Sequence, residues 1–597
     1  MSDSRLAASA YFRQNAEVSD MSISEFRCVV LAGILVLTGL SGCQVSDKSG
    51  KSLEGRPNMI IVLLDDTGFA DFGAYGSEIS TPNIDQLAAG GVQFTNFHAA
   101  AACTPTRGML LTGVDNHLVG MGNMVEIMAD NQFDQPGYEG FMGYSVVTLP
   151  TLLKDAGYHT YMAGKWHLGK TKKSIPAARG FERSISLMES GADNFEKKSY
   201  LPMYEFVHFY EDFEEVDLPD DFFSTDYYTD RLIEYIGEDH DDGKPFFAYL
   251  SLQAQHYPLQ APKEYIDKYD GKYDAGWEKI RAQRYARQVE LGVMPAGLTL
   301  PPIAAAPEWD SLSDEDRKMY SKRMSVYAGM LENVDANLGR LIAYLKEIGE
   351  ADNTVIVFMS DNGADNNEQD KAFPDWYAAN FDLSYERMGQ PGSYVNYGPG
   401  WAGVSGTPLT LFKAAASEGG LRVPLIISGP AGIRSDVRTD SFAFVTDITP
   451  TLLELAQVSA PEGAYNGKAV HPVDGESMLS YLRGEKKYIH APGKAVIYEM
   501  AGSAAVFQDG YKLTKNNPPF GNRQWRLYRP NEDPAEVNDL AKAKPDLVAG
   551  MMSEYVRFAK EVNLIEVPDD YNPITQIQKN VARNQGEEIL DEVPVLD

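Results

Sequence analysis

Residues 58–64 read NMIIVLL and are followed directly by Asp65 and Asp66. A continuous apolar run of this length, rich in β-branched residues, predicts a strand that is buried on both faces. Two further stretches, 246–252 (FFAYLSL) and 354–359 (TVIVFM), show the same pattern. Strands buried on both faces are typical of a parallel sheet that helices cover on both sides.

Helical patterns lie between these strands. The clearest begins after Ser313, whose S-x-x-D spacing to Asp316 suits a helix N-cap. Apolar side chains then recur at helical spacing from Tyr320 to Leu345, and Gly349 is placed to end the helix. Strands that alternate with such helices predict an α/β fold, with a large mixed, mostly parallel sheet sandwiched by helices.

The sequence pattern changes after residue 480. An amphipathic helix is predicted at 545–562, and Asp509 and Gly510 suit the turn of a β-hairpin. The last dozen residues are acidic and are expected to form a loose tail. A smaller C-terminal α+β domain is expected from this helix and from antiparallel strands at 495–500, 504–507, 511–514 and 524–528.

Charge and composition exclude one class of partner. The 597 residues carry a formal net charge of -32 at pH 7, and no dense basic run is found. Since clustered Lys and Arg hold phosphate backbones, no nucleic-acid partner is expected. The shares of hydrophobic (44%) and charged (23%) residues are typical of a folded globule, and the length exceeds what one core usually organises.

The N-terminal region contains a short apolar run at 29–40 (VVLAGILVLTGL). It is too short to cross a bilayer as an ordinary helix, so it predicts a signal sequence, with a short buried helix as the alternative. The stretch 40–43 (LSGC) resembles a bacterial lipobox, which makes Cys43 the predicted lipid attachment site. We expect an exported, periplasmic lipoprotein, anchored to the outer membrane only through this lipid.

Oxygen-bearing side chains follow two of the predicted strands. Asp65 and Asp66 follow the first strand, and Asp361 and Asn362 follow the strand at 354–359. Because ligands in such sheets collect at the carboxyl ends of the strands, we expect these side chains to share a site. Carboxylate and amide oxygens suit Ca²⁺ or Mg²⁺ and suit zinc poorly. A helix N-cap is the alternative for any single Asp.

Cys103 opens the stretch CTPTRG (103–108), and the three cysteines of the chain lie in such different contexts that no disulfide framework is expected. The pattern C-x-P-x-R resembles the signature of sulfatases in which the cysteine is oxidised to formylglycine. The resemblance covers the chain from Pro57 to about Val562. Further stretches resemble family motifs, in family order: GKWHLG (164–169), His256 before a P-x-x-x-P segment, SDNG (360–363), Lys413 and EGGLRVP (418–424).

This resemblance implies an alkaline-phosphatase-like fold and the hydrolysis of sulfate monoesters, in which an aryl sulfate and water give a phenol or alcohol and sulfate. The nucleophile would be the hydrate of 3-oxoalanine (formylglycine), derived from Cys103 by a formylglycine-generating enzyme, and the reaction would pass through a sulfated enzyme. One Ca²⁺ ion, or Mg²⁺, would be bound by Asp65, Asp66, Asp361, Asn362 and the modified Cys103.

The same resemblance implies roles for the basic side chains. Arg107 would hold the hydrated aldehyde, and Lys165 and Lys413 would bind the sulfate oxygens as charge builds up on them. His167 would act as the base that releases sulfate, and His256 as the acid or hydrogen-bond donor toward the leaving oxygen. A purely structural role is the alternative for each histidine.

Within the family, the chain looks most similar to the broad-specificity bacterial arylsulfatases. Residues 113–122 resemble a segment of that group, although Asn116 stands where a His is usual. His117, Tyr397 and Trp401 are the predicted substrate contacts, and plain packing under a long loop explains the two aromatic residues about equally well. The substrate stays open: a small aryl or alkyl sulfate ester, or a saccharide sulfate.

The predicted organisation has five segments. They are a signal region with lipobox at 1–43, a polar tether at 44–56, a catalytic sulfatase domain at 57–480, a small C-terminal subdomain at 481–565 and a C-terminal extension at 566–597.

Two other functions are kept as alternatives. One is a phosphate or phosphonate monoester hydrolase on the same fold, although a single cation with two lysines suits the lower charge of a sulfate ester better. The other, from a different class, is a non-catalytic lipoprotein that binds anionic sugars. That function predicts a missing catalytic group, whereas every expected group is present.

Overall fold

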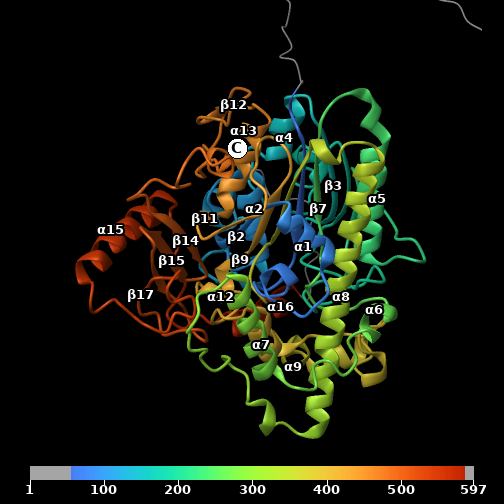
Figure 1. The fold of residues 1–597 in the computed structure, drawn as a ribbon, viewed down its shortest axis with the longest axis vertical. Helices are drawn as coiled ribbons and strands as arrows, with labels where there is room; N and C mark the ends of the chain where they lie inside the picture. The colour runs from blue at the N-terminus through green and yellow to red at the C-terminus, as the bar shows by residue number, and fades with distance from the viewer. Residues whose placement is uncertain (1–54, 585–597) are drawn as a thin grey trace, which may run out of the picture. The chain divides into compact units, whose positions relative to one another are not determined.

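The strand predicted from NMIIVLL is β1 (Asn58–Leu64), and all seven of its residues are buried. The computed structural model describes residues 55–584. Within them β1 pairs in parallel with β7 (Phe246–Ser251) on one side and with β8 (Thr354–Ser360) on the other. The chain therefore leaves β1 and β8 at the same edge of the sheet, side by side. Figure 1 shows β7, the other neighbour of β1, beside β3 (His159–Lys165).

Among the described residues the large sheet has 11 strands, in the order β10-β2-β9-β8-β1-β7-β3-β4-β5-β6, with β11 beside β2. Strand β9 runs antiparallel to both of its neighbours, and the pairs at the β6 edge are also antiparallel. The predicted mixed, mostly parallel sheet is confirmed. Its remaining strands are β2 (Gly91–His98), β3 (His159–Lys165), β4 (Arg183–Leu187), β5 (Phe209–Glu211), β6 (Glu214–Glu215), β9 (Arg422–Ser428), β10 (Val437–Thr439) and β11 (Ala443–Phe444).

Successive residues of β1 face opposite sides of the sheet and enter two different hydrophobic cores. Ile60 and Val62 belong to one core, and Met59 and Ile61 to the other. The first core is formed with α1 (Pro82–Ala89), α5 (Ser224–Asp239), α6 (Lys263–Asp267), α7 (Trp277–Leu291), α8 (Asp314–Glu347) and α11 (Gly398–Ser405). The second is formed with α2 (Cys103–Thr112), α4 (Leu149–Asp155), α13 (Ile448–Leu455) and α14 (Leu479–Leu482).

Helix α8 begins and ends where the sequence predicts. Ser313 is its N-cap, and the Ser313 hydroxyl accepts a hydrogen bond from the backbone N–H of Asp316 at 3.0 Å. The chain turns away after Glu347, with Gly349 at a φ of 77°. Shorter helices connect other parts of the fold: α3 (Asn116–Val119), α9 (Gln369–Ala372), α10 (Pro374–Asn380) and α12 (Glu418–Leu421).

The predicted C-terminal sheet is also present. Strands β14 (Val496–Met500), β15 (Ser503–Gln508), β16 (Tyr511–Lys515) and β17 (Arg526–Tyr528) pair antiparallel in this order, and α15 (Pro545–Glu561) packs on them. Asp509 and Gly510 both have positive φ, as a tight hairpin turn requires. A separate small hairpin joins β12 (Ala464–Tyr465) and β13 (Lys468–Ala469).

The segment predicted only as a C-terminal extension contains a helix. This helix is α16 (Pro573–Asn584). It has two buried apolar residues, Ile577 and Val581, too few for the periodic pattern to stand out in the sequence. The last dozen residues, the signal region, the lipobox with Cys43 and nearly all of the tether lie outside the described residues.

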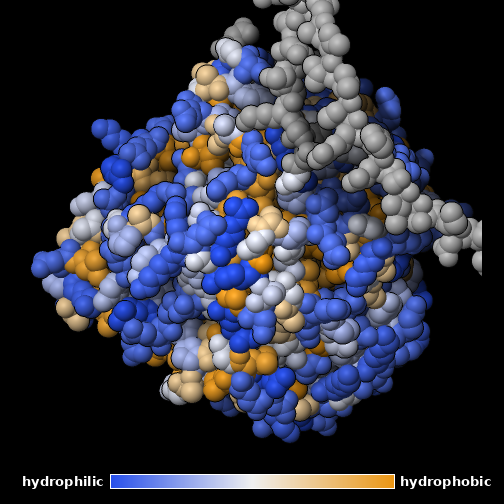
Figure 2. All heavy atoms as spheres, turned by 45° about the horizontal axis from the view of Figure 1, so that its top comes forward, coloured by the Kyte–Doolittle hydropathy of each residue, from blue (hydrophilic) through white to orange (hydrophobic). Residues whose placement is uncertain are grey.

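The face in Figure 2 is mostly hydrophilic, with hydrophobic residues in small separate groups. Among residues 55–584, no helix combines the length and the apolar character that a membrane span requires.

Candidate active site

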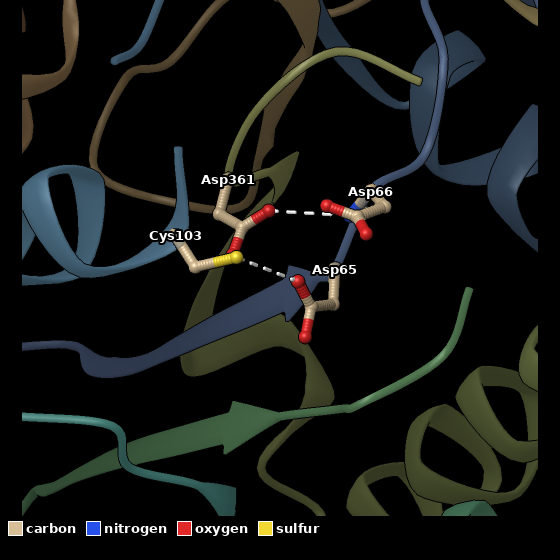
Figure 3. A group of neighbouring side chains, drawn as sticks. All are labelled: Asp65, Asp66, Cys103 and Asp361. Carbon is tan, nitrogen blue, oxygen red and sulfur yellow. Dashed lines mark hydrogen bonds between the residues drawn. The ribbon is translucent and has the colours of Figure 1, made fainter. Parts of the chain in front are cut away.

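Three carboxyl groups meet at the edge of the sheet where β1 and β8 end (Figure 3). Asp65 and Asp66 follow β1, and Asp361 follows β8. The backbone N–H of Asp66 donates to Asp361 Oδ1 at 3.2 Å. All three side chains are buried, and one ligand atom of each lies, together with Cys103 Sγ, within 4.8 Å of the others. The parallel pairing of β1 with β8 is what brings these residues together.

Cys103 and Arg107 reach this cluster from one face of α2. Cys103 is the first residue of the helix, and its Sγ lies 3.3 Å from Asp65 Oδ1. Residues four apart lie on the same face of a helix, so Arg107 points the same way. Its Nε and Nη2 donate to Asp361 Oδ2 at 3.0 and 2.9 Å. The spacing C-x-P-x-R thus has a geometric reason in this fold.

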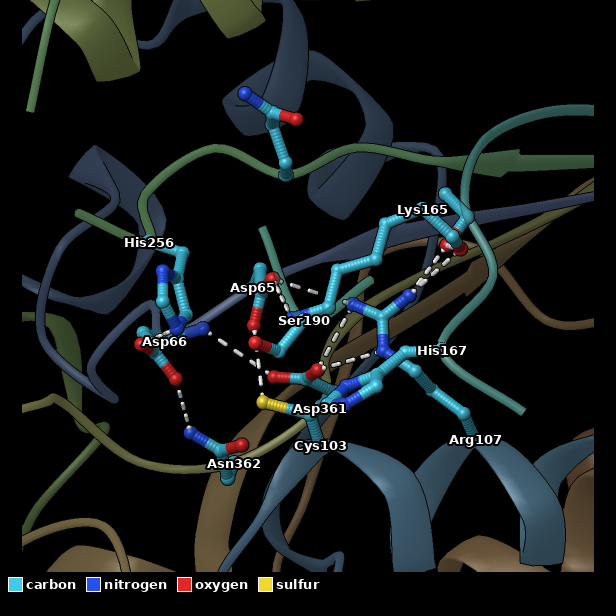
Figure 4. Close-up of polar contacts among 12 residues, drawn as sticks. Asp65, Asp66, Cys103, Arg107, Lys165, His167, Ser190, His256, Asp361 and Asn362 are labelled. Carbon is cyan, nitrogen blue, oxygen red and sulfur yellow. Dashed lines mark hydrogen bonds and ion pairs between the residues drawn. The ribbon is translucent and has the colours of Figure 1, made fainter. Parts of the chain in front are cut away.

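Two lysines, Lys165 and Lys413, complete the cluster, and Figure 4 shows Lys165 beside Asp65. Lys165, the last residue of β3, donates from Nζ to Asp65 Oδ2 at 2.5 Å. Lys413 Nζ lies 2.7 Å from Asp66 Oδ1 and 3.3 Å from Asp365 Oδ2. Both lysines are buried, so each cation is held against the carboxylates with little solvent screening.

Glycines allow the segment carrying Lys413 to approach the end of β8. A Cβ atom on Gly363 would lie 1.8 Å from the carbonyl oxygen of Gly419, which no side chain could tolerate. The backbone N–H of Lys413 donates to the carbonyl of Ala364 at 3.0 Å. The glycines in SDNG and EGGLRVP therefore serve close backbone packing beside the cluster.

The carboxyl groups differ in charge state because of their surroundings. Burial, together with repulsion from Asp65, raises the pKa of Asp361 to about 6. Burial also raises the pKa of Asp66 well above its usual value, despite the nearby Lys413. For Asp65 the effect of burial is outweighed by Lys165 and Arg107, which hold its pKa below the usual range. The nearby lysines and arginine therefore stabilise the negative charge of Asp65, but they do not offset the effect of burial on Asp66 and Asp361.

The same cluster fits a divalent cation bound by oxygen. Asn362 Nδ2 donates to Asp66 Oδ1 at 2.7 Å, while Asn362 Oδ1 is buried and has no hydrogen-bond partner among the described residues. An unpaired buried oxygen beside three carboxyl groups is a site that Ca²⁺ or Mg²⁺ would satisfy. A second set of possible ligand atoms, from Asp66, His256 and Asp365, lies next to it.

The two predicted histidines are both held in one tautomer. His256 Nδ1 donates to the carbonyl of Tyr257 at 2.6 Å, and its Nε2 lies 3.7 Å from Asp66 Oδ2. His167 Nε2 donates to Glu126 Oε1 at 2.9 Å, which leaves the buried Nδ1 with a free lone pair. Burial lowers the pKa of both imidazoles, so both rings are neutral at pH 7.

A pocket of about 200 Å³ opens beside Cys103. His256 and Lys413 line it together with Cys103, and Ile574, which also lines it, is 49% exposed. The pocket therefore connects the buried cluster with solvent. Its remaining lining residues are Ala102, Met124, Glu126, Ile127, Ser190, Tyr200, Leu201, Tyr257, Asp365, Asn367, Glu368, Gln369, Ala372, Ala414, Phe520, Pro573 and Ile577.

The predicted substrate contacts do not line this pocket. His117 lies between Asp115 and Glu499, with ring nitrogens 3.0 and 2.9 Å from their carboxylates. Trp401 is fully buried in a cluster of aromatic rings, and the ring of Tyr397 stacks on Tyr327. For Tyr397 and Trp401 the structure favours the packing alternative, and for His117 it favours a buried ion pair.

Glu126 was missed by sequence reasoning although it lines the pocket. It is 3% exposed, binds His167 and accepts a hydrogen bond from the Tyr204 hydroxyl. Burial would raise the pKa of Glu126, but His167 outweighs it and holds the pKa well below the usual range. No local pattern surrounds Glu126, because its partner His167 lies 41 residues further along the chain.

Comparisons with known proteins agree with this geometry. The sulfatase family model matches residues 57–458, and a model described as N-sulphoglucosamine sulphohydrolase, C-terminal, matches residues 412–560. The chain is similar to an uncharacterised sulfatase of Schizosaccharomyces pombe, with 37% identity over 86% of this chain and 96% of the relative. It is also similar to an arylsulfatase of Klebsiella aerogenes, with 38% identity over 71% of this chain and 91% of the relative.

Solved structures give the same fold. The crystal structure of Ps i-CgsB in complex with k-i-k-neocarrahexaose aligns with a TM-score of 0.61, covering 89% of this chain and 98% of that one at 23% identity. This likeness shows the fold alone. The activity is supported by the family model and the two relatives. The chain belongs to the sulfatase family and is a sulfuric ester hydrolase.

Proposed function

We propose that the chain hydrolyses aryl sulfate monoesters with a formylglycine derived from Cys103 and one bound Ca²⁺. The observation that carries this proposal is the position of Cys103. Its Sγ lies within 4.8 Å of ligand atoms from Asp65, Asp66 and Asp361, and the same side chain lines a pocket that is open to solvent. An unmodified thiol suits this place poorly, since burial and Asp65 raise its pKa well above the usual value.

Asp65, Asp66, Asp361 and Asn362 would hold the calcium ion. When bound, the ion would supply positive charge that offsets the carboxylates and stabilises the charge developing on the sulfate oxygens. Mg²⁺ is the alternative, and the oxygen ligands accept either ion.

The formylglycine would supply the attacking oxygen as its hydrate and, after transfer of the sulfo group, a second hydroxyl whose deprotonation releases sulfate and restores the aldehyde. Arg107 would orient this side chain from the next turn of α2. Lys165 contacts Asp65 and Lys413 contacts Asp66, and both would turn to the sulfate oxygens when an anionic substrate and the ion are bound.

The two histidines would transfer protons in different steps of the reaction. His167 Nδ1 carries a free lone pair, and Glu126 on the other ring nitrogen would stabilise the imidazolium that forms when His167 accepts the proton of the second hydroxyl. His256 lines the pocket beside Lys413. The negative charge of a bound sulfate would raise the pKa of His256, and its protonated Nε2 would then donate to the leaving oxygen.

Hydrolysis of 4-nitrophenyl sulfate tests this proposal, measured beside 4-nitrophenyl phosphate. The protein is produced with a formylglycine-generating enzyme and supplied with calcium, and the aldehyde is verified by peptide mass. We expect fast turnover of the sulfate and at most slow turnover of the phosphate. Preference for the phosphate would support the phosphate or phosphonate monoester hydrolase. Intact sulfate-ester binding without turnover by the matured protein would support the non-catalytic alternative.

We further propose that the chain is exported to the periplasm and anchored to the outer membrane by a lipid on Cys43. The supporting features are the apolar run at 29–40 and the lipobox-like stretch at 40–43. Loss of membrane association on Cys43→Ala, measured by fractionation of the bacterial envelope, is the expected result. Unchanged fractionation would contradict the anchor.

A further inference from the structure

Helix α16 reaches the active-site pocket from a part of the chain that neither family model matches. The two models end at residues 458 and 560, and α16 begins at Pro573. Nevertheless Pro573, Ile574 and Ile577 line the same pocket as Cys103. Whatever this helix contributes to the pocket is therefore additional to the part of the fold that the models cover.

Hydrogen bonds hold α16 in place against the segment that carries Glu126. Asn580 Nδ2 donates to the carbonyls of Glu126 and Met128, at 3.1 Å each. Gln576 Nε2 donates to Asn580 Oδ1 at 3.1 Å, and both amide side chains are buried. Just before the helix, the Tyr571 hydroxyl donates to the carbonyl of Ile127 at 2.7 Å. Buried polar side chains that are satisfied in this way fix the position of the helix.

The apolar face of α16 continues an aromatic cluster around the pocket. Ile577 is 9% exposed and packs in one cluster with Tyr200 and Tyr257, which also line the pocket. Met124, Ile127, Leu201 and Phe520 extend this apolar lining. The pocket therefore has a hydrophobic wall, and Ile574 is an exposed part of it.

The size and polarity of the pocket suit one apolar ring. An apolar cavity of roughly 150 Å³ holds a benzene molecule, and this pocket measures about 200 Å³. Among the polar lining groups, Ser190 bonds to the Tyr200 hydroxyl at 2.6 Å and Glu126 bonds to His167. A saccharide would place hydroxyl groups against the apolar wall without partners, which costs binding free energy.

We propose that α16 is the specificity element of this sulfatase. Ile577 and Ile574 form the wall against which the leaving group packs, so the chain selects sulfate monoesters with a single apolar aromatic leaving group over saccharide sulfates. This inference rests on the proposed function, and it assigns selectivity to a helix outside both family models.

The first test compares two substitutions on the same face of α16. Ile577→Ala removes part of the pocket wall, whereas Val581→Ala, one turn further on and also buried, removes similar packing away from the pocket. With 4-nitrophenyl sulfate we expect Ile577→Ala to lower kcat/KM on the order of tenfold, mainly through KM, because the ring contact exists in both ground and transition states. With N-acetylglucosamine 6-sulfate we expect little change. Val581→Ala should alter neither substrate.

Equal losses on both substrates, no loss on either, or the same loss in Val581→Ala would overturn the proposal. A second measurement separates it from the proposed chemistry: calorimetric titration of 4-nitrophenyl sulfate into calcium-loaded Cys103→Ala protein. Adding Ile577→Ala should weaken binding about tenfold, and adding Val581→Ala should not. Absence of binding, or binding insensitive to Ile577, would refute the role of α16. Binding that responds as expected in a chain whose matured wild type has no turnover would refute the chemistry alone.

Discussion

Two buried clusters of charged side chains in this protein have different purposes. In the active-site cluster, ligand atoms of Asp65, Asp66 and Asp361 converge on one another beside an open pocket. In the second cluster, which we name the C-terminal interface, Lys512 lies between two carboxylates, and these are not among the described groups whose ligand atoms could hold an ion. Its members are His98, Glu418, Arg422, Lys512 and Glu536, and the side chains of all five are buried.

The C-terminal interface joins the C-terminal sheet to the large sheet. Lys512 on β16 places its Nζ 2.9 Å from Glu418 and 2.8 Å from Glu536. His98 on β2 lies 3.0 Å from Glu418. Burial would raise the pKa of Glu418, but Lys512 and His98 outweigh it and keep the pKa well below the usual value.

The comparison teaches that buried charge alone does not identify a functional site. Among the described residues, the groups of carboxylate, thiol and imidazole that could hold an ion are both at the active site. Carboxylates whose ligand atoms converge beside a pocket indicate chemistry, whereas carboxylates that flank one shared cation indicate structural stabilisation. Substitutions in the two clusters should therefore separate activity from stability.

The largest effect is expected for Cys103→Ala. Without the precursor of the formylglycine, kcat/KM for 4-nitrophenyl sulfate should fall at least about 10⁴-fold, while the melting temperature stays close to wild type. Cys103→Ser should instead attack once and remain as a stable sulfate ester, which peptide mass would detect. Appreciable turnover by the alanine variant would contradict the assigned nucleophile.

Removal of the metal should have the next largest effect. Dialysis against a calcium chelator should lower kcat about a thousandfold. The reason is that the ion stabilises the charge of the transition state by several kcal/mol. Added Ca²⁺ should restore the rate, and Mg²⁺ should do so less well. Full activity in chelated protein, with metal content checked by atomic emission, would contradict the role of the cluster as an ion site.

In the C-terminal interface the corresponding loss should be one of stability. Lys512→Met leaves Glu418 and Glu536 buried without their shared cation, and we expect the free energy of unfolding to fall by about 3–5 kcal/mol. The folded fraction should retain wild-type kcat. Lys494→Met is the matched control, because the exposed pair of Lys494 with Glu476 should contribute less than about 1 kcal/mol. A lowered kcat in folded Lys512→Met protein would contradict the assignment of the C-terminal interface to stability alone.

A pH dependence should mark a second buried contact between the C-terminal sheet and the large domain. Burial would lower the pKa of His117, but hydrogen bonds to Asp115 and Glu499 outweigh it and raise the pKa from 6.5 to about 9. The stability due to this charge is complete below pH 6.5 and is lost as the pH rises through 9. The destabilisation caused by His117→Gln should therefore shrink by roughly 3 kcal/mol over this range. A pH-independent difference in chemical denaturation would show that His117 is not charged.

The smallest effect is expected for Glu126→Gln. The amide keeps a hydrogen bond to His167 but loses the charge that stabilises its imidazolium, so kcat should fall about tenfold or more. The limb of the pH–kcat profile that reports His167 should move to lower pH. Tyr204→Phe removes the other contact of Glu126 and leaves the pair intact, so it serves as the control. Equal effects of both substitutions would favour a structural role for Glu126.

The sequence by itself determined the elements that local patterns specify. The apolar run of β1, the N-cap of α8 and the hairpin at Asp509 and Gly510 all depend on neighbouring residues, and all are found where they were predicted. The C-x-P-x-R spacing belongs to the same class, because an interval of four residues in a helix fixes which side chains share a face.

Only the tertiary structure decided the surroundings of the site. Glu126 reaches His167, and α16 reaches the pocket beside Cys103, through contacts between residues far apart in the chain. The aromatic residues Tyr397 and Trp401 have the chemistry of a substrate wall, yet the fold packs them into the core. Local sequence records which face of a helix or strand is apolar. Which other surface covers that face depends on the packing of the whole chain, and no short pattern contains it.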